Sequence, residues 1–212
     1  MIFRKIFFIV FFLGGALTMV SMAQSGAARQ WNFDSDKPGT IADGFTSEVG
    51  EWKVAAQASV PSKPNGLAQL AKSERPIFNL ALATGTSYQD LDLSVQLLAL
   101  SGAVDQGGGV LWRAADARNY YIARYNPLEK NFRVYKVVQG QRTQLGTADV
   151  PAHEGWYALR IVMKGEAIEC YLDGQRYLEA KDGSFPAAGR IGLWTRADAQ
   201  TIFDNLAVKP VQ

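Results

Sequence analysis

The stretch GGGVLWRAADARNYYIARYNPLEKNFRVYKVVQGQRT, residues 107–143, decides the fold class of this chain. Its apolar and aromatic residues fall into three runs, 110–114, 120–126 and 131–138, which polar or glycine-containing turns separate. Asn126-Pro127 ends the second run, because proline donates no ladder hydrogen bond and disfavours the helical region in the residue before it. The pattern predicts three consecutive antiparallel strands joined by short turns.

The rest of the chain continues this pattern in both directions. Residues 88–100, 156–164 and 168–172 alternate apolar and polar side chains with the period of two that marks a half-buried strand. Shorter strands are expected at 31–34, 50–54, 67–71, 77–83, 141–150, 176–180, 190–196 and 201–208. Because no segment after the N-terminal region sustains a helical period, the sequence predicts an all-β fold, a two-sheet antiparallel jelly-roll sandwich.

The first 23 residues have the composition of a secretory signal peptide. Arg4 and Lys5 precede the apolar run 6–20, and Ser21-Met22-Ala23 supplies small residues for a cleavage site. The alternative, an uncleaved membrane anchor, needs about 20 apolar residues, and this run is shorter. We expect a signal peptide at 1–23, a flexible lead at 24–30 and a single jelly-roll domain at 31–212. The mature protein would be secreted or periplasmic, without membrane insertion.

The charge balance argues against nucleic acid as a partner. The chain has 22 Lys and Arg residues against 20 Asp and Glu, and Arg4 and Lys5 account for the formal net charge of +2. Cleavage therefore leaves no basic excess to neutralise phosphates. The single cysteine, Cys170, excludes an internal disulfide, and its apolar strand face predicts a small buried hydrophobe.

Three segments carry a resemblance to a known fold family: GGGVLWRAADARNYYIARYN at 107–126, WYALRIVMKGEAIECYLDGQ at 156–175 and GRIGLWTRADAQTIFDNLAV at 189–208. Together they resemble the concanavalin A-like lectin/glucanase jelly roll. Within it, the chain is similar to bacterial secreted laminin-G-like domains and to the family associated with 3-keto-glycoside hydrolysis, often grouped with family 16 glycoside hydrolases. The resemblance spans about residues 31–208 and implies two curved sheets, with ligands on a concave face or at one rim. This fold carries lectins, binding modules, adhesion domains and hydrolases alike.

The sequence identifies no catalytic residue. A retaining glycosidase needs two carboxylates about 5–5.5 Å apart, which the family 16 pattern supplies as Glu-x-Asp-x-x-Glu. None of the eight glutamates here is followed two positions later by aspartate. Asp90 and Asp92 share a strand face that we interpret as solvated. The only histidine, His153, lies in a predicted turn with Glu154 as its one candidate orienting partner.

Basic residues are concentrated in the central stretch. From Arg113 to Arg142 it holds seven Lys and Arg residues against two acidic ones. Aromatic rings beside arginines suit sugar binding, because sugar C–H faces pack on rings and hydroxyls accept charge-assisted hydrogen bonds. Strand parity and charge select these candidate ligand-binding residues: Arg113, Tyr120, Arg124, Asn126, Lys136, Trp194 and Arg196.

We expect Arg113, Arg124 and Trp194 to approach one another on the concave sheet. Ile191 and Leu193 occupy the other face of the Trp194 strand and must meet the core, which pushes Trp194 outward and exposes it. An exposed tryptophan favours a ligand or partner that covers it. The alternative interpretation is that these residues are solvated arginines and structural aromatics.

The only metal hypothesis concerns Asp34 and Asp204. The termini of a jelly roll often lie in adjacent strands, which would make these two residues neighbours. The resemblance implies a structural calcium in this fold, but calcium takes six to eight oxygen ligands and the sequence offers only two or three. We therefore expect no cofactor, with a structural calcium at Asp34 and Asp204 as the alternative.

Three functions remain open from the sequence. The first is a non-catalytic carbohydrate-binding domain whose partner is a glycan or oligosaccharide. The second is a sugar-processing enzyme of the 3-keto-glycoside hydrolase, lyase or glycoside hydrolase type, which the resemblance implies. The third is a protein-binding adhesion or assembly module. The sequence does not fix the oligomeric state.

Overall fold

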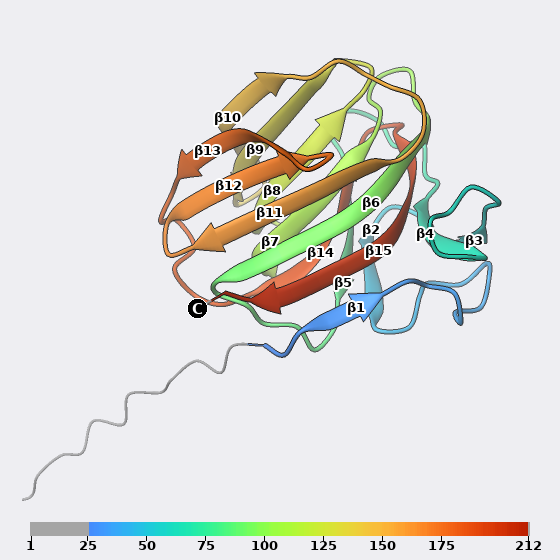
Figure 1. Cartoon of the computed structure of the whole chain (residues 1–212), viewed down its shortest axis with the longest axis horizontal. Coiled ribbons are helices and arrows are strands. Elements are labelled where there is room, and N and C mark those ends of the chain that lie inside the picture. The colour runs from blue at the N-terminus through green and yellow to red at the C-terminus, as the bar shows by residue number, and fades with distance from the viewer. Residues whose placement is uncertain (1–25, 212) are drawn as a thin grey trace, which may run out of the picture.

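The computed structural model describes residues 26–211, so the expected signal peptide at 1–23 lies outside the described residues. This part of the chain forms two antiparallel β-sheets that pack face to face (Figure 1). The expectation of an all-β jelly-roll sandwich of the concanavalin A-like class is thereby confirmed. Residues 26–211 contain no helix, and hence no helix with the length and apolar character to cross a membrane.

The eight-stranded sheet has β6 and β15 at its centre, and it lies toward the viewer in Figure 1. Its strands, in spatial order, are β13 (Gln175–Lys181), β12 (Ala167–Leu172), β11 (Tyr157–Lys164), β6 (Leu91–Ser101), β15 (Gln200–Pro210), β4 (Asn65–Gln69) and β3 (Trp52–Ala56), with β1 (Arg29–Trp31) paired to β15. Both β4 and β1 use the same edge of β15, one beside each half of that long strand.

The seven-stranded sheet contains the central stretch of the sequence. Its strands, in spatial order, are β10 (Gln141–Asp149), β9 (Asn131–Val138), β8 (Asn119–Asn126), β7 (Gly108–Asp116), β14 (Arg190–Arg196), β5 (Phe78–Ala83) and β2 (Phe45–Val49). The three strands expected from residues 107–143 are therefore β7, β8 and β9, and they pair consecutively as antiparallel neighbours.

Two details of the chain differ from expectation. Strand β2 is absent from the prediction, because its five residues, FTSEV, include only two apolar side chains and lie between Gly44 and Gly50. Arg29 and Gln30, expected in the flexible lead, form strand β1 by pairing with Val208 and Ala207. The paired structure thus begins two residues earlier than the sequence indicates.

The main core lies between the sheets and is built from the alternating positions of both. On β6 it takes Leu91, Leu93, Val95 and Leu97, which were expected to face inward. Cys170 is completely buried in this core, as its strand face predicted. Burial at about 25 cal/mol per Å² of apolar surface makes this layer the main stabilising element of a chain without disulfides.

A second apolar cluster lies on the opposite, outer face of the seven-stranded sheet. Leu193 belongs to the core between the sheets, whereas its neighbour Trp194 belongs to this outer cluster, as strand alternation requires. The cluster contains Leu80, Leu82, Leu111, Ala114, Tyr120, Ile122, Tyr135, Val137 and Trp194. An outer face this apolar is unusual for an antiparallel sheet, whose outer face is commonly polar. It lies beneath the candidate site described next.

Candidate functional site

Arg124 and Trp194 lie in one cross-strand row on the outer face of the seven-stranded sheet. Gly109 of β7 pairs with Trp194 on one side and with Arg124 on the other. A Cβ at position 109 would stand 1.9 Å from the backbone oxygen of Ala123, so only glycine fits at this position of the strand.

A pocket of about 490 Å³ opens on this face, and we call it the arginine pocket. Its wall comes from β2, the start of β5, the β7–β8 turn, the start of β10 and the end of β14. It is lined by Val49, Pro76, Ile77, Phe78, Leu80, Ala117, Arg118, Gly140, Gln141, Arg142 and Arg196. Three of these described lining residues are arginines and none is acidic.

Arg142 is the central basic residue of the pocket. Its guanidinium carbon lies 4.3 Å from the ring centroid of Tyr135, 5.4 Å from that of Phe78 and 6.0 Å from that of Trp194. Such contacts stabilise a cation on aromatic faces. Among residues 26–211 no carboxylate pairs with Arg142, and its Nη1 is buried without a hydrogen-bond partner.

Arg124 and Arg196 flank the same region and, unlike Arg142, have acidic partners. Arg124 is 2% exposed and donates to Glu129 Oε2 at 2.8 Å and to Asn131 Oδ1 at 2.5 Å. Arg196 Nη1 pairs with Asp105 Oδ2 at 3.2 Å. The Nε atoms of both arginines are nevertheless buried without a partner among the described residues.

Burial and neighbouring charges shift three pKa values in this region. Burial lowers the pKa of Arg142, and the neighbouring charges of Arg196 and Arg124 lower it further. Burial raises the pKa of Asp105, although Arg124 and Arg196 oppose that shift. Burial would also raise the pKa of Glu129, but Arg124 outweighs it and holds that pKa below its usual value.

Arg113 does not belong to this face, which corrects the expected approach to Arg124 and Trp194. Its φ is +47°, and the pairing of β7 with β8 shifts register between Trp112 and Asp116. This irregularity interrupts the two-residue alternation, so the Arg113 side chain turns toward the eight-stranded sheet. There it donates to Asp90 and to the carbonyls of Gln89, Gly165 and Phe185 at 2.6–3.0 Å.

Lys136 is also remote from the arginine pocket. It pairs with Asp182 Oδ2 at 2.7 Å and donates to Ser184 Oγ at 2.9 Å, both in the β13–β14 connection. Tyr121 donates to the other oxygen of Asp182. Lys136 therefore ties the edge of the seven-stranded sheet to the opposite layer, in keeping with its shared parity with the core residues Phe132 and Val134.

Asn126, Tyr120 and Trp194 form the supporting layer of the pocket. Asn126 is fully buried, donates to Asp105 Oδ1 at 2.6 Å and accepts from the backbone of Glu129. Trp194 Nε1 donates to the hydroxyl of Tyr120 at 3.3 Å. Trp194 points away from the inter-sheet core, as expected. The expectation that it is exposed is wrong, however: only 1% of its surface is accessible, because Phe78 and Arg142 cover it.

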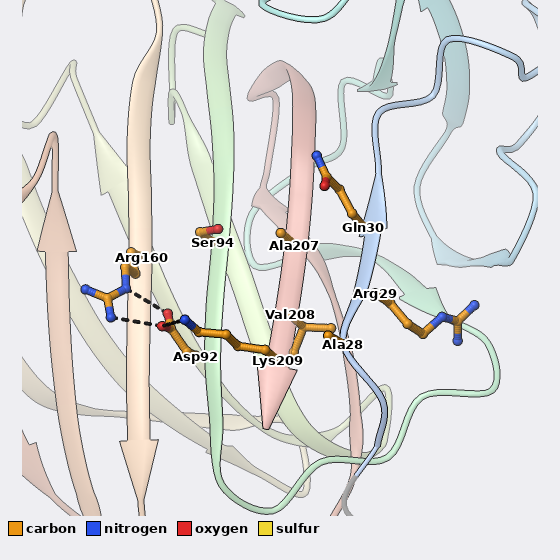
Figure 2. Close-up of a pocket in the computed structure, with 9 residues that line it drawn as sticks. All are labelled: Ala28, Arg29, Gln30, Asp92, Ser94, Arg160, Ala207, Val208 and Lys209. Atoms are coloured by element: carbon orange, nitrogen blue, oxygen red, sulfur yellow. Dashed lines mark hydrogen bonds and ion pairs between the residues drawn. The ribbon is translucent and has the colours of Figure 1, made fainter. Parts of the chain in front are cut away.

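A second hollow lies on the outer face of the eight-stranded sheet, between β1, β15, β6 and β11 (Figure 2). Small side chains, Ser94 and Ala207, form its base. Along one side Arg160 donates to both oxygens of Asp92, at 2.7 and 2.9 Å, and Lys209 Nζ lies 3.4 Å from the same carboxylate. This groove continues toward Gln96, Tyr171 and Asn205.

The two hollows differ in charge balance. In the groove Arg160 and Lys209 pair with Asp92; burial would raise the pKa of Asp92, but Arg160 and Lys209 hold it below its usual value. The third cation of the groove, Arg29, donates to the carbonyls of Thr84 and Gly85. In the arginine pocket Arg142 has no such carboxylate among the described residues. Unpaired, partly desolvated donors are the stronger indication of a ligand site, so the arginine pocket is our candidate functional site.

Asp34 and Asp204 do meet, through Ser62. The Ser62 backbone donates to Asp204 Oδ2 at 2.7 Å, and the Ser62 hydroxyl donates to Asp34 Oδ2. Asp34 Oδ1 is buried without a partner, and burial together with the charge of Asp34 raises the pKa of Asp204. Carboxylate oxygens are the type of ligand that calcium prefers. In the described part of the chain, however, no third Asp, Glu, His or Cys side chain joins these two.

The sequence-based selection missed Arg142, Phe78 and Tyr135 as site residues. Arg142 was counted only as part of the basic stretch, because its own strand shows no clear alternation. Pairing of β10 with β9 places it opposite Val137, from where its side chain reaches rings of β9, β5 and β14. Such proximity across four strands leaves no local signal in the sequence.

Comparison with known proteins places this chain by fold rather than by sequence. No protein-family model matches it, and no curated protein matches it by sequence. The carbohydrate binding module CBM66 from Bacillus subtilis superposes with a TM-score of 0.67 and 20% identity, over 82% of this chain and 99% of that one. A Bacillus subtilis protein of unknown function with a galectin-like fold gives 0.64 and 14% identity, over 88% and 97%.

A point mutant of the GH43 protein BlXynB from Bacillus licheniformis is also similar, with a TM-score of 0.62 and 15% identity. The match covers 86% of this chain but 39% of that one. At these identities the likeness establishes the jelly-roll fold that carbohydrate-related proteins share.

Proposed function

We propose that this protein is a secreted or periplasmic carbohydrate-binding domain that acts without catalysis, and that the arginine pocket holds the sugar. The observation that carries the proposal is Arg142, which lies on three aromatic rings with a buried guanidinium nitrogen free of any described partner. The fold shared with a carbohydrate binding module supports the same ligand class.

The chemistry of the pocket suits a sugar ring. Phe78 and Ile77 offer apolar surface on which C–H faces can pack, and Ile77 is 40% exposed. Arg118, Arg142 and Gln141 surround that surface with donors for hydroxyl or acidic oxygens. A few placed polar groups on an apolar floor are the usual composition of a small-ligand site.

Affinity electrophoresis of the mature domain in gels that contain different polysaccharides tests the proposal. We expect retardation by at least one polysaccharide, and loss of that retardation in Phe78→Ala. Arg160→Ala, which alters the groove of Figure 2 instead, is the matched control and should bind normally. Free migration in every gel would remove the proposal, and loss of binding only in Arg160→Ala would move the site to the groove.

A second candidate function, a sugar-processing enzyme, rests on Asp105 and Glu129. Both carboxylates flank Arg124, and their pKa values move in opposite directions, upward for Asp105 and downward for Glu129. Such a pair can divide the roles of proton donor and base. Release of sugar from disaccharides or their 3-keto forms, abolished by Asp105→Asn, would establish this function. Binding with no turnover would leave the non-catalytic function.

A structural role for calcium at Asp34 and Asp204 is also part of this proposal. The Asp34 Oδ1 atom that lacks a partner and the two carboxylates joined by Ser62 support it. A bound cation would offset the repulsion between two carboxylates brought together in a partly buried place. Its expected effect is on stability, because Asp34 follows β1 and Asp204 lies in β15, near the edge where β1 and β4 attach.

Export is proposed from residues 1–23 alone. The intact mass of the protein recovered from the periplasm or medium tests it: cleavage after Ala23 gives a chain that begins at Gln24. A full-length mass in the membrane fraction would contradict it.

A further inference from the structure

We infer that the arginine pocket selects a sugar that carries an anionic group, and that a uronic acid, whose planar carboxylate matches a guanidinium fork, is its ligand class. A sulfated sugar shares the anionic chemistry and is separated from the uronic acid by the test below. The inference rests on the proposed function and goes further, because it names which glycans the pocket takes.

The first argument is the local charge. Arg118, Arg142 and Arg196 line the pocket, and the described lining residues include no Asp or Glu. The ion pair with Asp105 compensates the charge of Arg196. The Arg118 guanidinium donates to the backbone carbonyl of Gln139, and no carboxylate within residues 26–211 forms an ion pair with this guanidinium or with that of Arg142. The pocket therefore keeps two uncompensated positive charges, which a neutral sugar would leave unmatched.

The second argument is the desolvation of the donors. Arg142 Nη1 is buried with no described hydrogen-bond partner, and the Nε atom of Arg196, which also lines the pocket, is in the same condition. A buried charged donor without an acceptor is costly, so such groups are rare in folded proteins unless something binds them. An anionic oxygen is the acceptor that forms the strongest hydrogen bonds with a guanidinium.

The third argument is the mixed character of the surface. A bare inorganic anion would use only the arginines, whereas the pocket also presents Val49, Ile77 and Phe78. Phe78 itself packs against Trp194 at a tilt of 42°, with ring centroids 5.3 Å apart, and this contact holds the Phe78 ring in place. A carboxylated pyranose has both features, an apolar ring face and a charged edge.

Polygalacturonate and the same polymer with its carboxyl groups methyl-esterified form the matched pair of probes. Titration calorimetry or affinity gels should show binding of the free acid, weakened by added salt, and binding of the ester weaker by on the order of tenfold or more. Arg142→Gln should remove the preference for the acid, while Arg160→Gln, in the groove, should retain it. Unchanged thermal unfolding of Arg142→Gln establishes that the variant is folded.

The alternative outcomes are distinct. Equal affinity for acid and ester, or an Arg142→Gln variant that still prefers the acid, would overturn the inference while leaving glycan binding intact. Preference for heparin or another sulfated glycan over polygalacturonate would overturn the uronic acid assignment. Binding of no glycan at all, neutral or acidic, would remove the proposed function together with the inference.

Discussion

Trp194 and Arg124 lie in one row across the seven-stranded sheet, with only Gly109 between them. Neither side chain is available as a free ligand contact, because each is at most 2% exposed. Trp194 instead supports Phe78 and Arg142, and Arg124 fixes the Glu129 and Asn131 side chains. The row thus supports the arginine pocket from beneath, and the pocket residues that reach solvent include Arg142, Arg118, Ile77 and Phe78.

Replacing Arg124 by alanine should destabilise the domain by about 2–3 kcal/mol, because its charged hydrogen bonds to Glu129 and Asn131 form inside the structure. Arg133→Ala is the matched control. Arg133 reaches the same Glu129 carboxylate at 3.6 Å from a more exposed position, and its loss should cost less than about 1 kcal/mol. Urea unfolding measures both. Equal effects of the two substitutions would refute the assignment of Arg124 as a buried support.

Arg113→Ala should lower the free energy of unfolding by about 3–5 kcal/mol without changing glycan binding. The substitution removes the ion pair with Asp90 and leaves three backbone carbonyls without the hydrogen bonds that Arg113 donates. Arg176→Ala, in an exposed pair with Glu179, should change the stability by less than about 1 kcal/mol. A loss of glycan affinity in a folded Arg113 variant would restore Arg113 to the ligand site.

Calcium should raise the thermal unfolding temperature of the mature domain, and EDTA should reverse the change. At a calcium concentration 100 times the dissociation constant the gain is about 2.7 kcal/mol. Asp204→Asn should abolish the response, whereas Asp149→Asn, at an exposed position of β10, should preserve it. An unfolding temperature that is the same in calcium and in EDTA would show that Asp34 and Asp204 act only through Ser62.

Acid should weaken the domain partly through Asp182. Although burial opposes it, hydrogen bonds from Lys136, Ser184 and Tyr121 hold the pKa of Asp182 far below its usual value of 3.8. The folded state therefore favours the carboxylate, so this stabilisation is present above about pH 4 and is lost as the pH falls below it. Between about pH 5 and about pH 3, the free energy of unfolding should decrease less in Asp182→Asn than in the wild-type protein. An identical pH dependence in wild type and variant would exclude this contribution.

Local sequence patterns predicted most of the fold. The alternation in residues 107–143 was sufficient for β7, β8 and β9, and the apolar positions of β6 correctly indicated its buried face. These patterns are reliable because one face of each strand must meet the core. They also assigned Trp194 to the correct side of its sheet.

The site was predicted less well, for physical reasons that particular residues make clear. The alternation of side chains between the two faces of β7 breaks down at Arg113. A positive φ at this non-glycine residue turns its side chain to the other face, and no local sequence pattern indicates this. Arg142 becomes a site residue only through the register of β10 and the closeness of β5 and β14. Burial of Trp194 likewise depends on residues from other strands. Long-range register, rather than local propensity, decides all three.

The pairing of β1 with β15 has a mechanical consequence. Arg29 lies opposite Val208, so both ends of the folded domain emerge at the same end of the eight-stranded sheet (Figure 1). A force that pulls these ends apart acts across the three-residue pairing and opens its hydrogen bonds one after another, as in a zipper, instead of shearing them together. Stretching in this direction should therefore detach β1 at low force. The seven-stranded sheet, which carries the arginine pocket, should bear no load and stay folded.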